Sequence, residues 1–72
     1  MDYTAFYAEV ANWIMQVNQQ ASTLGMQSPA FWDWVVTSTG DIGNKYGNTD
    51  LVVKQMLMLI NWLEGVHKNM QQ

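Results

Sequence analysis

The first third of the chain carries an amphipathic helical pattern. Its apolar residues recur mainly at steps of three and four, which places them on one side of an α-helix. They are Tyr3, Phe6, Tyr7, Val10, Trp13, Ile14, Val17, Ala21 and Leu24. Asp2 precedes the pattern as a suitable N-cap, and Gly25 follows it, where a C-terminal glycine is common. We therefore predict a helix over residues 3–24.

A second helical pattern begins at Ser28 and Pro29. Serine is a favoured N-cap, and proline is well accepted at the first helical position. The apolar face continues through Phe31, Trp32, Val35, Val36, Thr39, Ile42 and Tyr46. These signals predict a helix over residues 29–46.

Two glycines make the end of this second helix ambiguous. Gly40 and Gly43 lie inside the pattern, and each lowers helix stability by about 1 kcal/mol relative to alanine. Either one helix continues, with the glycines admitting a close neighbour, or it ends near Ser38 and a short helical turn follows. We favour the continuous helix because Ile42 and Tyr46 stay on the same face.

The third pattern follows a turn at residues 47–50, which offers several N-caps. Its main apolar stripe again has steps of three and four and comprises Val52, Met56, Leu59, Leu63, Val66 and Met70. We predict a helix over residues 50–70. Three helices joined by short connections predict an all-α fold, a small antiparallel three-helix bundle formed by a single domain over residues 1–72.

Composition favours a packed fold for so short a chain. The 72 residues are 49% hydrophobic and only 12% charged, the opposite of a disordered chain. Cysteine is absent, so disulfides and thiolate metal sites are excluded. Four tryptophans are present, and each can bury roughly 150–250 Å². This burial explains how a small core is stable without disulfides or a thiolate-bound metal.

The charges and the lengths of the apolar runs argue against nucleic-acid binding and against a membrane span. The net charge is −3, arginine is absent, and Lys45, Lys54 and Lys68 are scattered, so no cationic cluster is available for nucleic acid. An acidic inhibitor of a basic partner is an alternative, although the six acidic residues form no run. We expect no membrane span and a cytoplasmic location, because the longest apolar run has five residues against the roughly 20 that a span needs.

Residue types that carry catalysis are scarce. His67 is the only histidine, and near a helix C-terminus it interacts favourably with the helix dipole. Glu64 and His67 have the Glu-x-x-His spacing of di-iron bundles, but those sites need a second such pair. We therefore predict no catalytic residue, no metal site and no cofactor.

The third helix has more apolar surface than one bundle interior needs. Leu51, Met58 and Trp62 share a second stripe on one side, while Val53, Leu57 and Ile60 extend the apolar arc on the other. Either this helix is the central element, wedged between the other two, or the extra stripe meets a second copy or another protein.

Trp34 raises the same question on the second helix, because it lies off the apolar stripe beside Asp33. It is either an interface anchor or a side chain that folds back over Phe31 or Ser38 at the bundle edge. Our sequence-based hypothesis is a non-catalytic protein–protein interaction module or homodimer that uses Trp34, Leu51, Met58 and Trp62. The alternative in another class is a carrier of a small apolar ligand in an aromatic-lined core.

Overall fold

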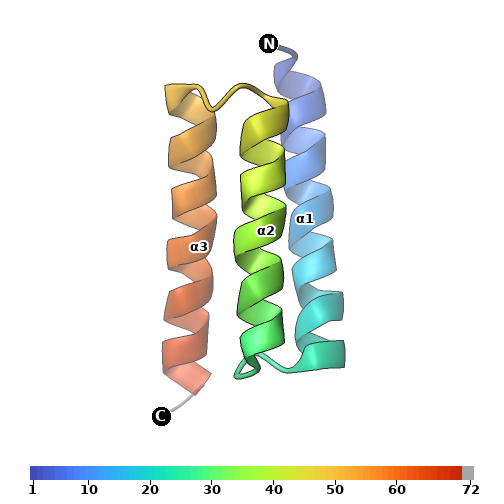
Figure 1. Ribbon diagram of the computed structural model, residues 1–72, viewed down its shortest axis with the longest axis vertical. Helices are drawn as coiled ribbons and strands as arrows, with labels where there is room; N and C mark the ends of the chain where they lie inside the picture. Colours follow the sequence, from blue (N-terminus) through green and yellow to red (C-terminus); the bar gives the residue numbers. More distant parts are fainter. Residues whose placement is uncertain (71–72) are drawn as a thin grey trace.

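The chain folds into three helices that run side by side in alternating directions (Figure 1). The computed structural model describes the backbone of residues 1–70 and the side chains of residues 1–69. Its helices are α1 (Tyr3–Leu24), α2 (Pro29–Lys45) and α3 (Asp50–Met70). No strand occurs over residues 1–70, so the predicted all-α three-helix bundle is confirmed. The prediction that Met70 joins the buried stripe lies outside the described side chains.

The predicted caps set the helix ends. The Asp2 carboxylate accepts a hydrogen bond from the Ala5 amide at 3.0 Å, which satisfies an otherwise unpaired donor in the first turn of α1. The Ser28 hydroxyl does the same for the start of α2, and Pro29 is its first residue. Gly25 ends α1 with a φ of 85°, a conformation that residues with a Cβ rarely adopt. All three predictions of capping residues are confirmed.

Helix α2 passes through Gly40 and Gly43 without a break and ends one residue before the predicted position. The two glycines differ in their surroundings. A Cβ at Gly43 would lie 2.7 Å from Oδ1 of Asn48, in the turn that follows α2, whereas nothing lies within 4 Å of a Cβ at Gly40. The close-neighbour interpretation therefore holds for Gly43, where the chain turns back, and not for Gly40.

A single hydrophobic core joins the three helices. Its buried residues are Phe6, Val10, Trp13 and Val17 of α1, Phe31 and Val35 of α2, and Val52, Met56, Leu59 and Leu63 of α3. The backbone of α2 packs closely against both α1 and α3, while α1 and α3 make no close backbone approach in the described chain (Figure 1). The interpretation that the third helix is the central element is therefore wrong. The short connections make α2 the neighbour of both.

Aromatic side chains fill the seams between the helices. The Trp13 ring stacks on Trp34 of α2 with 5.6 Å between centroids, and its Nε1 donates a hydrogen bond to the Ser38 hydroxyl at 2.7 Å. Trp32 donates in the same way to the Met26 carbonyl at 2.7 Å. Each indole therefore contributes apolar area while its N–H keeps a partner.

Candidate functional site

Helix α3 exposes four large apolar side chains on the side opposite its buried stripe. Val53, Leu57, Met58 and Trp62 keep 40%, 54%, 51% and 43% of their surfaces accessible. At about 100° per residue, Val53 and Leu57 lie on one flank of this side, and Met58 and Trp62 lie on the other. We call this region, with the charged residues on the same side of the helix, the outer face of α3. Apolar surface of this kind often marks an interaction site.

Two of the predicted interface residues lie on this face. Met58 and Trp62 are one helical turn apart, so their side chains are neighbours on the same flank. Leu51 lies on the same side at the start of α3 but is half-buried. The structure thus brings Leu51, Met58 and Trp62 onto one flank of one helix, as their spacing predicts.

Trp34 is placed elsewhere. It is half-buried, stacks on Trp13 with an interplanar angle of 8°, and its ring centroid lies 6.1 Å from that of Phe31. Of the two interpretations, the structure shows a side chain that packs at the bundle edge. The stack places Trp34 on the α1 side of α2, away from the stripe on α3.

Val53 and Leu57 belong to the outer face although we did not include them among the predicted interface residues. The signal was present, since both extend the apolar arc of the third helix. Sequence spacing alone does not say which flank of an apolar helix its neighbours cover. That depends on where α1 and α2 pack, and they leave the side chains of both residues exposed.

Charged residues share the outer face with the two apolar flanks. Lys54 pairs with Asp50 at 3.1 Å, one turn earlier, and the side chains of both are largely exposed. Glu64 and Lys68 repeat the same acid–base spacing near the other end of α3, and both are exposed. Such exposed pairs contribute little stability, so these residues act mainly through their pattern of charge.

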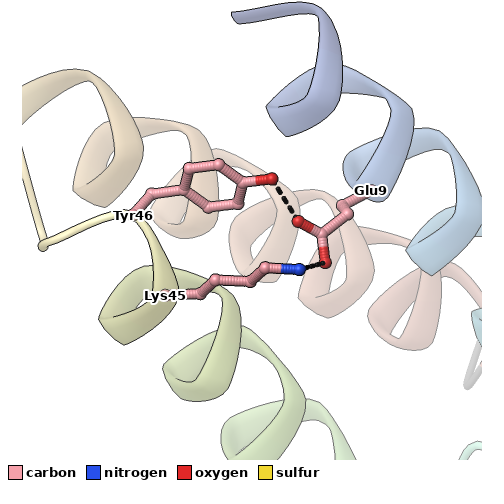
Figure 2. A network of polar contacts seen from close by, with 3 residues as sticks. All are labelled: Glu9, Lys45 and Tyr46. Carbon is pink, nitrogen blue, oxygen red and sulfur yellow. Dashed lines mark hydrogen bonds and ion pairs between the residues drawn. The ribbon is translucent and has the colours of Figure 1, made fainter. Parts of the chain in front are cut away.

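A polar cluster ties α1 to the end of α2 (Figure 2). The Tyr46 hydroxyl donates a hydrogen bond to one Glu9 oxygen, and the Lys45 ammonium donates to the other at 3.1 Å. These two bonds hold the pKa of Glu9 below its usual 4.5. The same Glu9 carboxylate raises the pKa of Tyr46 to about 12. Both shifts move away from neutrality, so neither group is suited to exchange protons near pH 7.

An open pocket lies beside this cluster between α1 and α2. Its volume is about 170 Å³, and polar side chains such as Asn12, Gln16 and Asp41 contribute to its lining. Sites for drug-sized ligands usually have about 300–1,000 Å³ and mostly apolar walls. The pocket therefore lends no support to an apolar-ligand carrier.

The described residues offer little to a metal or a membrane. No group of three histidine, cysteine or acidic side chains within residues 1–69 lies close enough together to hold a metal ion. His67 packs edge-on against Trp32, with 5.4 Å between the ring centroids. None of the three described helices is both long and apolar enough to cross a bilayer.

Comparison with known proteins adds no family. No protein-family model matches the sequence, and neither the curated proteins nor the solved structures yield a significant match.

Proposed function

We propose that this chain is a non-catalytic protein–protein interaction module that binds its partner through the outer face of α3. The observation that carries this proposal is the exposure of Val53, Leu57, Met58 and Trp62 within ten residues of one helix. The exposed large apolar residues of α1 and α2 are spread over a longer stretch of chain.

Loose packing does not account for this exposure. The accessible surface is 4680 Å², close to the roughly 4,600 Å² expected for a compact protein of this mass. All three helices already contribute to a buried core. The apolar side chains on the outer face are therefore surplus to the fold, which supports a role in binding.

The residue types also suit an interface. Tryptophan is enriched among the few residues that dominate binding energy, and methionine adapts its shape to a partner surface. Trp62 and Met58 lie side by side on one flank and would form the apolar centre of the contact. The exposed charges on the same face would lie next to these side chains and would contact the partner as well.

Substitution of Trp62 tests the proposal. We expect Trp62→Ala to weaken association by about 2 kcal/mol or more, because the indole loses its buried contact with the partner. The matched control is Met15→Ala, which shortens a side chain of α1 that is 61% exposed. Sedimentation across a concentration range measures self-association, and titration with any purified partner measures binding to another protein.

Circular dichroism should show that both variants remain folded. If Trp62→Ala and Met15→Ala behave alike in both binding measurements, the outer face of α3 is not the binding surface and the proposal fails.

A further inference from the structure

The charges on α3 have a two-fold pattern centred on Leu59. Asp50 lies nine residues before Leu59 and Lys68 lies nine residues after it. Lys54 and Glu64 lie five residues before and after the same position. Each charge is therefore matched by one of opposite sign at the same distance on the other side of the centre.

These four side chains lie where a partner could reach them. All four are exposed, and at about 100° per residue they fall on the side of α3 opposite the buried Val52, Met56, Leu59 and Leu63. The pattern therefore lies on the surface that the proposed function assigns to binding.

Among two-fold pairs with the helices in full register, the pattern is self-complementary only when the helices are antiparallel. When two copies of α3 meet antiparallel at the level of Leu59, each Asp50 faces a Lys68, and each Lys54 lies at the same level along the axis as a Glu64 of the other copy. When the copies meet parallel and in register about a two-fold axis, every charge faces its own like charge. Exposed pairs add little affinity, but unfavourable charges suppress the wrong alignment, so the pattern fixes orientation and register.

The apolar side chains agree with the same register. A helix rises about 1.5 Å per residue, so this alignment brings Trp62 within about 3 Å, along the axis, of the level of Met58 in the second copy. In a two-fold antiparallel pair, each flank of one helix lies beside the same flank of the other helix. The Met58–Trp62 flank of one chain therefore meets the Met58–Trp62 flank of the other.

We propose that a second copy of this chain binds the outer face of α3, antiparallel and centred at Leu59. The inference rests on the proposed function, since it names the partner of the same surface. A dimer of this kind covers Met58 and Trp62 in both chains at once, because a two-fold interface uses the same patch twice.

Paired charge swaps test the alignment. The first variant carries Glu64→Lys with Lys68→Glu, and the second carries Asp50→Lys with Lys54→Glu; neither changes the net charge. In the proposed alignment each variant places like charges opposite each other when it meets itself. The two variants place opposite charges at all four positions when they meet one another.

We expect the wild type to dimerise in sedimentation equilibrium and each swap alone to associate at least tenfold more weakly. An equimolar mixture of the two swaps should regain wild-type association. A wild type that stays monomeric at every concentration overturns the inference, and so does a mixture that associates no more tightly than its components.

Cysteine cross-linking provides a second test that does not depend on the folding of the swaps. Cysteine is absent from the sequence, so introduced thiols have no competitor. A mixture of Asp50→Cys and Lys68→Cys chains should form a disulfide-linked dimer under mild oxidation faster than either variant alone, because these two positions share both the level and the direction in the proposed alignment. Equal rates in the mixture and in the separate variants overturn the alignment.

The two proposals fail in different ways. If Trp62→Ala weakens binding while the swaps and cross-links show no preferred register, antiparallel self-pairing is wrong and the binding face stands. If Trp62→Ala matches the Met15→Ala control, the binding face itself is wrong.

Discussion

Gly40 and Gly43 show how the surroundings of a residue decide the effect of a substitution. Both lie inside α2, where glycine is about 1 kcal/mol less favourable than alanine. A side chain at Gly43 has no free space, because Asn48 folds back over this position. The backbone amide of Asn48 donates a hydrogen bond to the Gly43 carbonyl at 2.8 Å. Asn48 has a φ of 53°, and its side chain donates to Asn44 at 2.8 Å. The turn after α2 therefore occupies the space that a side chain at Gly43 would need.

We expect Gly40→Ala to stabilise the protein by about 1 kcal/mol and to raise the unfolding midpoint by roughly 4–8 °C. Gly43→Ala is its matched control. The new methyl group displaces Asn48, so this variant should be at least about 1 kcal/mol less stable than Gly40→Ala. Urea unfolding of the two variants and the wild type measures both effects. Equal stabilisation by the two substitutions would show that the turn does not need the glycine.

At the scale of elements, the polar cluster of Glu9, Lys45 and Tyr46 joins α1 to the last turn of α2. The Tyr46 ring also packs edge-on against Phe6, with 5.2 Å between centroids. The contact therefore combines a hydrogen bond that depends on ionisation with an apolar contact that does not. Replacing the tyrosine by phenylalanine separates the two.

The stability contributed by this cluster should fade at both ends of the pH range. The pKa of Glu9 is lowered from 4.5, so its contribution is present above pH 4.5 and is lost as the pH falls through the folded-state value. The pKa of Tyr46 is raised from 10.0 to about 12, so its contribution is present below pH 10 and is lost as the pH rises through about 12.

We expect Tyr46→Phe to have a lower free energy of unfolding than the wild type near neutral pH. The difference should shrink as the pH falls below 4.5 and as it rises above 10. Denaturant unfolding at a series of pH values measures it. Glu9→Gln serves as the control, because it removes the charge that shifts Tyr46. A constant difference between the wild type and Tyr46→Phe at all pH values would show that the bond to the Glu9 carboxylate is not formed.

At the scale of the whole molecule, Trp34 and Trp62 have different roles, although the sequence places both outside the main apolar stripes of their helices. Trp34 packs on Trp13 across the α1–α2 seam, whereas Trp62 keeps 43% of its surface exposed on the outer face of α3. The fold and the binding surface therefore use separate side chains. Mutations should separate stability from association.

We expect Trp34→Ala to lower the free energy of unfolding by about 1–3 kcal/mol, since it removes a stacked and partly buried ring. Association of the folded protein should be unchanged. Trp62→Ala should weaken association and change the free energy of unfolding by less than about 1 kcal/mol. Thermal unfolding at low protein concentration, where association is minimal, gives the first quantity, and sedimentation gives the second. Parallel effects of the two substitutions would contradict this division.

The sequence by itself determined the helices and most of their ends. Apolar spacing predicted all three helices, and Asp2, Ser28 and Gly25 marked their limits, because capping depends on residues that are close along the chain. The placement of Leu51, Met58 and Trp62 on one flank of α3 was also predictable, since the helical repeat fixes which residues share a side.

Only the tertiary structure decided which apolar side chains are covered. It placed α2 rather than α3 at the centre, turned Trp34 onto Trp13, and left Val53 and Leu57 exposed. It also joined Glu9 to Tyr46, which are 37 residues apart in the sequence. Periodicity gives the direction of a side chain around its own helix, but burial depends on which neighbouring helix lies in that direction, and packing sets that arrangement.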